Sequence, residues 1–172
     1  MSIKVTLATI ATILALGGIT ANSFINSALG QQSFTAELTG DEEVPPVNTD
    51  ATGIFNLVIV NQTSGYQLSI NNLANATAAH IHRGEEGENG KIVVTLYNAT
   101  MPTAPTSGLL SQGNITASNL EGPLAGQQLT DLIETIDNGT AYVNVHTADF
   151  PLGEIRGQLA AEDEVAAEDE EG

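Results

Sequence analysis

The sequence predicts an all-β domain, an antiparallel Greek-key-like β-sandwich with one short helix. Most segments beyond residue 30 either alternate apolar and polar residues with a period of two or form short apolar runs between turn residues, and both patterns are typical of strands. These segments recur about every 10–15 residues, a spacing that favours an antiparallel sandwich or barrel. The chain has no cysteine, so an apolar core must hold the fold without disulfides.

The strand predictions follow the chain in order. Residues 53–60 carry the strongest signal, because Ile54, Leu57 and Ile59 lie in a nearly continuous apolar run. Residues 65–70 alternate well, and segment 61–65 before them is typical of a hairpin turn. Residues 109–118 carry an ambiguous pattern. Further strands are expected at 33–38, 77–82, 91–97, 140–146 and 153–159.

One segment has helical periodicity. Between Gln128 and Gly139, apolar residues recur at helical spacing at Leu129, Leu132, Ile133 and Ile136. Gln128 or Thr130 can cap the start, and Asn138-Gly139 supplies a left-handed stop. The sequence therefore predicts one short helix over 129–137.

The two ends of the chain differ from the middle. Residues 1–30 combine Lys4, an apolar stretch and small residues before position 30, which is typical of a cleaved secretory signal peptide; a retained N-terminal anchor is the alternative. Residues 161–172 form an acidic tail that we expect to be disordered. The folded domain is then 31–160, secreted or held at a cell surface or in a periplasm-like compartment. No later segment is apolar enough to span a membrane.

The net charge of −17 argues against nucleic acid as a partner, because binding phosphates needs clustered Lys and Arg and the chain has only four such residues.

Export also makes glycosylation relevant. Five Asn-x-Ser/Thr acceptor sites for glycans occur, at Asn61, Asn75, Asn98, Asn114 and Asn138. We therefore expect an acidic protein that can be a glycoprotein in a host that uses these sites.

The chain has only three histidines, and all three lie in predicted strands. His80 and His82 are two residues apart, so in a strand their side chains point to one face, about 6.5–7 Å apart along the backbone. His146 ends another predicted strand. If the two strands are neighbours, three imidazoles converge and can bind a transition metal. The alternative is that each histidine is an ordinary hydrogen-bonded structural residue.

Such a site would leave one side of the metal open, as redox and catalytic metals require, unless Asp149 or a glutamate of loop 85–88 closes it. Three nitrogens suit copper or zinc, and the higher affinity of Cu(II) for nitrogen sites favours copper over zinc.

The loop from Gly84 to Gly90 is acidic and lacks a following Lys-Ser/Thr, so we expect a tight turn and no phosphate loop. Calcium binding by this loop is a weaker alternative.

Arg156 is one of only three basic residues after residue 30. The favoured interpretation is structural, as an ion pair with Glu154 or Glu37. The functional alternative is a catalytic role, in which Arg156 steers a small anion such as superoxide toward an open metal. Nucleophilic hydrolysis is disfavoured, because cysteine is missing and no Gly-x-Ser-x-Gly motif occurs.

Three blocks resemble the CHRD domain, the module named after chordin. They are the segment 38–53 (LTGDEEVPPVNTDATG), the segment 79–90 with its Ala-His-Ile-His and three glycines at a spacing of three, and the closing segments 142–147 and 151–159. The blocks occur in the family's order and frame Phe34 to Leu159. The resemblance implies a fold more readily than a function. Because chordin is extracellular and binds growth factors, it also implies a non-enzymatic extracellular or cell-surface interaction module.

A second, local similarity is to the copper site of copper–zinc superoxide dismutases. Those enzymes carry a His-x-His pair and a distant histidine followed by an aspartate, which here would be His80, His82, His146 and Asp149. The bridging histidine, the zinc site and the disulfide of that family have no counterpart. The sequence thus predicts an exported metal-binding domain, with superoxide dismutation as the expected chemistry if it is an enzyme. The interaction module is the alternative, and its protein partner is not indicated.

Overall fold

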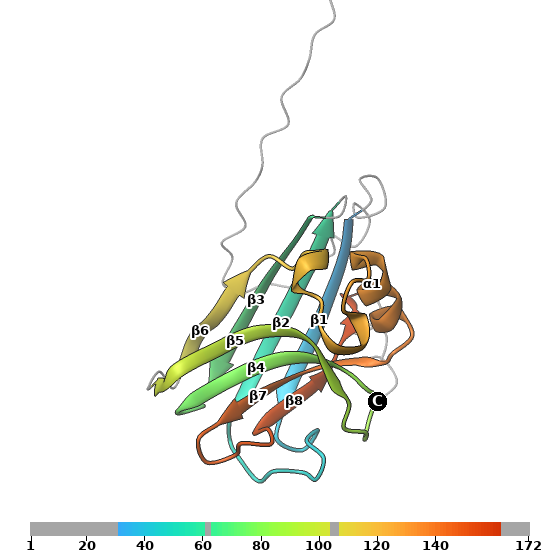
Figure 1. Cartoon of the computed structure of the whole chain (residues 1–172). Helices are drawn as coiled ribbons and strands as arrows, with labels where there is room; N and C mark the ends of the chain where they lie inside the picture. The colour runs from blue at the N-terminus through green and yellow to red at the C-terminus, as the bar shows by residue number, and fades with distance from the viewer. Residues whose placement is uncertain (1–30, 61–62, 104–106, 163–172) are drawn as a thin grey trace, which may run out of the picture.

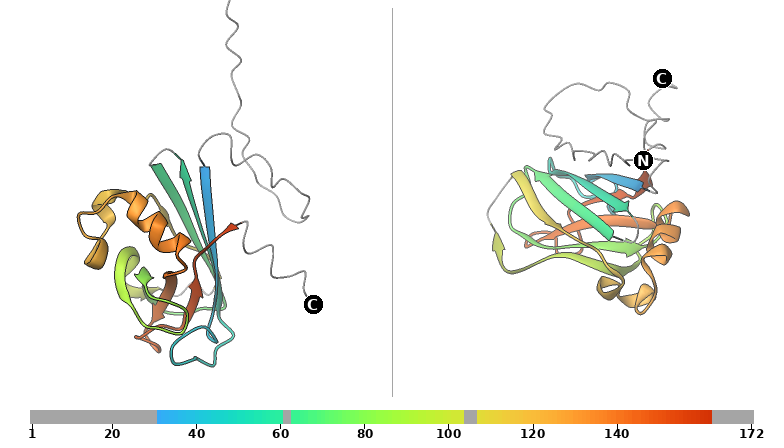
Figure 2. Two further views of the ribbon diagram at one scale, coloured as in Figure 1. Left: turned by 90° about the vertical axis from the view of Figure 1, so that its right-hand side faces the viewer. Right: turned by 90° about the horizontal axis from the view of Figure 1, so that it is seen from above.

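The computed structural model describes residues 31–60, 63–103 and 107–162. These residues form one antiparallel sheet of nine strands, in the order β5-β4-β7-β8-β1-β2-β3-β6, with β9 beside β1. The sheet curls until two layers face each other, and α1 covers one end (Figures 1 and 2). The predicted all-β class with one short helix is confirmed.

The strand bounds follow the predicted pattern, with most differences at the ends. The strands are β1 Gln31–Thr39, β2 Thr52–Val60, β3 Thr63–Asn71, β4 Ala76–Arg83, β5 Lys91–Thr103, β6 Ser107–Gly113, β7 Ala141–Thr147, β8 Ile155–Gln158 and β9 Ala160–Ala161. Val60 pairs directly with Thr63, so the first hairpin loop is shorter than the predicted 61–65 segment. The ambiguous 109–118 segment is a strand only up to Gly113.

Alternation along the strands sends apolar side chains into the space between the layers. In β2, Phe55 and Leu57 are fully buried, while Ile54 and Val58 on the opposite face are exposed. Leu68 of β3 joins the same core. Full burial of one such side chain contributes about 1.5–3 kcal/mol to the free energy of unfolding. The core is therefore the main stabilising element of the fold.

The helix α1, Leu129–Asp137, lies where the sequence predicts it. The backbone N–H of Gln128 donates to the Asp131 carboxylate at 2.8 Å, which satisfies the start of the helix. Gly139 has φ +67° and ends it, as expected for a left-handed stop. Leu132 and Ile136 are buried against the sheet. Two 3-10 turns, Ala117–Asn119 and Gly122–Leu124, precede it.

The predicted signal peptide and most of the acidic tail lie outside the described residues. Ala161 still pairs with Phe34, so the folded region reaches one residue past the expected boundary at Ala160. Of the possible glycan acceptors, Asn98, Asn114 and Asn138 are exposed, and their modification stays a prediction. Across residues 31–60, 63–103 and 107–162, no helix is both long and apolar enough to cross a membrane.

Candidate metal centre

The three histidines converge in the structure. His80 and His82 lie on β4 and His146 on β7, and these two strands are antiparallel neighbours. One ring nitrogen from each histidine lies within 4.8 Å of those of the other two. The ring centroids of His80 and His146 are 5.0 Å apart, and those of His80 and His82 are 5.6 Å apart. The convergence predicted from the His-x-His spacing is therefore confirmed.

The histidines occupy the face of the β4–β7 pair that points away from the apolar core. Ile81 and Val143, on the other face, are completely buried in that core. His82 is nonetheless only 8 % exposed. The site is therefore a partly buried layer on the outside of the sheet, not a cavity within the sandwich.

Backbone carbonyls fix two of the rings. His82 Nδ1 lies 3.0 Å from the Gly90 carbonyl oxygen, and His146 Nδ1 lies 3.1 Å from that of Pro151. A carbonyl oxygen only accepts, so each Nδ1 must carry the proton and each Nε2 is left with its lone pair. This is the usual way in which a second interaction orients a metal-binding imidazole.

One nitrogen in each ring is buried without a hydrogen-bond partner among the described residues. These atoms are Nδ1 of His80, Nε2 of His82 and Nε2 of His146. A buried polar nitrogen without a partner costs about 1–3 kcal/mol. Each of the three clustered rings therefore has a buried nitrogen to offer a metal ion, and binding of a cation would remove this cost.

Burial also keeps the rings neutral. Desolvation, reinforced by the neighbouring His146 and His82, lowers the pKa of His80 from 6.5 to about 4. Burial likewise lowers the pKa of His82 and of His146, although their hydrogen bonds to the Gly90 and Pro151 carbonyls oppose the shift. All three imidazoles are thus in the metal-binding form at neutral pH.

Among the residues that the structure describes, no carboxylate joins the histidine cluster. The group of candidate ligand atoms found among the described residues contains the three histidines alone, and Asp149 and the glutamates of loop 85–88 are outside it. Asp149, Glu85, Glu86 and Glu88 are all exposed. Loop 84–90 is the tight turn expected from its glycines, since a side chain at Gly90 would overlap the Arg83 carbonyl.

Arg156 lies next to this centre, but the residue is only 1 % exposed. It donates to the carbonyls of Glu85 and Glu88 at 3.0 and 2.9 Å and, more weakly, to Asn89 Oδ1 at 3.4 Å. Within the described part of the chain it forms no ion pair with Glu154 or Glu37. These contacts match a structural role, although the partner is the glycine loop and not a carboxylate.

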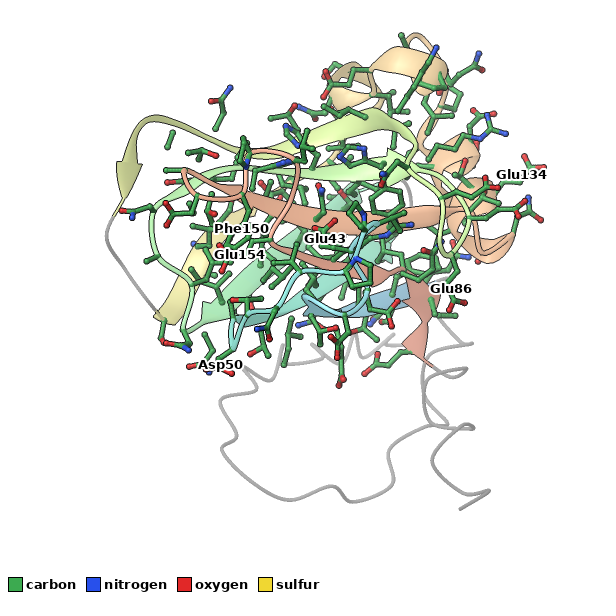
Figure 3. The ribbon with its side chains drawn as sticks, turned by 90° about the horizontal axis from the view of Figure 1, so that it is seen from below. Glu43, Asp50, Glu86, Glu134, Phe150 and Glu154 are labelled. Atoms are coloured by element: carbon green, nitrogen blue, oxygen red, sulfur yellow. The ribbon has the colours of Figure 1, made fainter. Side chains whose placement is uncertain are left out.

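Sequence reasoning missed two neighbours of the site. Tyr142 stacks on His82 with ring centroids 4.9 Å apart, and its hydroxyl accepts a hydrogen bond from the Gly90 N–H at 3.0 Å. Glu43, from the β1–β2 loop, is 5 % exposed with Oε1 unpaired among the described residues. Figure 3 views the molecule from below and labels Glu43 and Glu154 at the end that carries the β1–β2 loop. Period-two alternation back from His146 would have indicated Tyr142; nothing in the sequence indicates the burial of Glu43.

Comparison with known proteins agrees with the three sequence blocks. The model of the CHRD domain matches residues 34–159. The chain belongs to the CHRD domain family. No curated protein and no solved structure matches it. In this CHRD domain, the match spans all three histidines and every side chain that surrounds them.

Proposed function

We propose that this CHRD domain binds one transition-metal ion, with copper as the favoured metal and zinc as the alternative, through His80, His82 and His146. The supporting observation is the cluster of three imidazoles, each with a buried nitrogen that has no hydrogen-bond partner among the described residues. Metal–nitrogen bonds of about 2.0–2.1 Å at tetrahedral angles place the ligand nitrogens about 3.4 Å apart, and the three nitrogens here lie within 4.8 Å of one another, so side-chain rotations would complete the site.

The donor set argues for copper. All three candidate ligands are imidazoles, and the chain has no cysteine to supply sulfur. Nitrogen sites bind Cu(II) more tightly than the other divalent first-row metals, including zinc. A set of three ligands with no carboxylate leaves a coordination position for a small molecule, whereas structural zinc sites are normally closed by a fourth ligand.

The open position and the redox couple of copper favour a one-electron reaction, and we propose superoxide as the substrate. His80, His82 and His146 would hold the copper, which when bound would supply one-electron redox chemistry for a dismutation in which one superoxide is oxidised to oxygen and a second, with two protons, is reduced to hydrogen peroxide. The protein's part is to hold three neutral imidazoles and to shield the centre beneath its loops. The export pattern of residues 1–30 supports an extracellular or periplasm-like location.

Metal binding is tested on purified protein by elemental analysis and by competition with chelators. We expect one copper per chain, and we expect His82→Ala to lower the affinity at least about 100-fold, because it removes one of three ligands. Glu86→Ala is the matched control in the neighbouring loop, since Glu86 is exposed and outside the ligand group. Equal losses from both changes would move the site to the loop and refute the assignment.

Superoxide chemistry requires a separate measurement. Stopped-flow or competition assays on copper-quantified protein should show superoxide loss faster than in buffer that contains the same free copper. A fully loaded protein with no activity above this control would remove the enzymatic proposal. It would leave metal binding intact.

A non-enzymatic interaction module is the second candidate, and one observation favours it. Ile54 on β2 and Leu109 on β6 are 50 % and 53 % exposed and flank Ser69, the residue with which both are paired. Nearby, a hollow of about 580 Å³ is lined by neutral side chains that include Asn56 and Gln112. Loss of cell-surface binding in Ile54→Ser, with unchanged metal content, would support this alternative.

A further inference from the structure

A column of three flat groups lies beside the proposed metal site. The imidazole of His82 stacks on the ring of Tyr142, with centroids 4.9 Å apart and planes 12° from parallel. The guanidinium carbon of Arg156 lies 3.5 Å from the centroid of the same Tyr142 ring. The Tyr142 ring is thus shared between a proposed ligand and a permanent positive charge.

The sheet topology places Tyr142 between the other two groups. β7, which carries Tyr142, lies between β4 and β8. His82 pairs with Tyr142 across the β4–β7 ladder, and Arg156 comes from β8 on the opposite side. The guanidinium carbon is therefore less than about 9 Å from the centre of the His82 ring, within the range of a weakly screened charge in a protein interior.

Hydrogen bonds hold the column in place. The Tyr142 hydroxyl accepts from the Gly90 N–H at 3.0 Å, and the Gly90 carbonyl lies 3.0 Å from His82 Nδ1. Tyr142 and His82 are thus connected through one residue of the glycine loop as well as through their ring faces. Arg156 is bonded to the carbonyls of Glu85 and Glu88 in that same loop.

The charge on Arg156 is permanent and desolvated. Arginine remains protonated at all relevant pH values, and this side chain is only 1 % exposed. Its hydrogen bonds in the described residues go to uncharged oxygens, and the Glu43 carboxyl interacts with it electrostatically. A fixed positive charge beside a metal site raises the energy of a divalent ion more than that of a monovalent one, because repulsion scales with the ion's charge.

We propose that Arg156, acting through the Tyr142 ring, is a positioning residue that shifts the preference of the three-histidine site from Cu(II) toward Cu(I). This inference rests on the proposed copper site and names the residue that sets which oxidation state of copper the site prefers. Arg156 does not touch the metal or the substrate. It fixes the loop and the ring that orient His82, and its charge sets the relative affinity of the site for the two copper oxidation states.

The test measures dissociation constants of wild type and variants for Cu(I), Cu(II) and Zn(II) by chelator competition. In Arg156→Met, which keeps a long apolar stem but removes the charge, we expect the affinity for Cu(II) relative to Cu(I) to rise at least about tenfold. Zn(II) should follow Cu(II), because both are divalent. Arg156→Lys keeps the charge and should stay within about threefold of wild type.

A second measurement tests the contact between Tyr142 and the site. The chain has three tyrosines and no tryptophan, so its intrinsic fluorescence is that of tyrosine. Cu(II) at His82 should quench Tyr142 strongly, because the two rings are in contact. Tyr142→Phe should remove the largest share of the quenching, and Tyr66→Phe, on a strand paired with neither β4 nor β7, should retain it.

The outcomes separate the two levels of the proposal. Wild-type protein that takes up no copper, or takes it up independently of its histidines, refutes the metal site itself. Histidine-dependent copper binding with the same Cu(II)-to-Cu(I) affinity ratio in wild type and Arg156→Met refutes the role of Arg156 alone. If Arg156→Met does not fold, Arg156→Gln, which also removes the charge, is measured in its place, and an unchanged affinity ratio there refutes the role of Arg156; unchanged quenching in Tyr142→Phe overturns the contact between Tyr142 and the site.

Discussion

Glu43→Gln should change how the stability of the metal-free protein depends on pH. Glu43 is 5 % exposed, and its burial raises the pKa of the carboxyl from 4.5 to about 7, against the attraction of the Arg156 charge. A raised pKa means that the folded protein holds the proton more tightly than the unfolded chain. The resulting stabilisation is fully present below pH 4.5 and is lost as the pH rises through about 7.

The size of the effect follows from the shift. Each pKa unit corresponds to about 1.4 kcal/mol, so ionisation of Glu43 should cost the folded state about 3 kcal/mol at pH 8 relative to pH 4. Glutamine has nearly the same shape and cannot ionise. The free energy of unfolding of Glu43→Gln, measured relative to wild type, should therefore increase by about 3 kcal/mol across that range.

Urea unfolding of both proteins at several pH values, with a chelator present, measures this difference. The histidines titrate in both proteins, so their contributions cancel in the comparison. Glu42→Gln is the control, because Glu42 is exposed and adjacent in the same loop. Parallel stability curves for wild type and Glu43→Gln would show that the carboxyl is not held protonated by burial.

Three further predictions concern the site and the core. Burial lowers the pKa of His80 to about 4 and also lowers the pKa of the other two histidines, so zinc affinity should fall far less between pH 7.5 and 6 than the roughly fiftyfold loss expected of three ordinary histidines; zinc titrations at the two pH values measure this. Gly157→Ala should lose about 2–3 kcal/mol in urea unfolding, since the new methyl would lie 2.0 Å from the Glu37 carbonyl oxygen of β1; wild-type stability would refute that packing. Leu57→Ala should lose about 2–5 kcal/mol by thermal or urea unfolding, and Val58→Ala on the exposed face of the same strand less than about 1 kcal/mol.

Local rules explain why much of the fold could be predicted. In β2, the buried residues Phe55 and Leu57 alternate with exposed residues. Consecutive residues of a strand point to opposite faces, so this alternation alone identifies the face that is buried. The helix was predictable for the same reason, because the residues with helical spacing and the terminating Gly139 lie within one short segment of the chain. Strand ends were less predictable: β5 continues to Thr103 because Ala76 pairs with that residue, a contact that sequence pattern does not encode.

Some features of the candidate metal site also follow from local sequence, whereas others depend on contacts between distant segments. The His80–His82 pair follows from spacing, but its meeting with His146 depends on β4 pairing with β7, strands about 60 residues apart in the chain. The role of Arg156 depends on a loop that folds over it, so its contacts with Glu85 and Glu88 could not be inferred from its own strand. Glu43 is a charged residue in a polar loop, and only tertiary packing makes it buried.

The strands that carry the three histidines are interior strands of the sheet. β4 is paired on both sides, by β5 and β7, and β7 by β4 and β8. Amide hydrogens in such strands exchange with solvent only through large openings of the molecule. The ligand backbone should therefore keep its shape after the metal is removed, unlike that of zinc fingers, which unfold without metal. A chelator should strip this domain reversibly, so that metal uptake would be a binding event decoupled from folding.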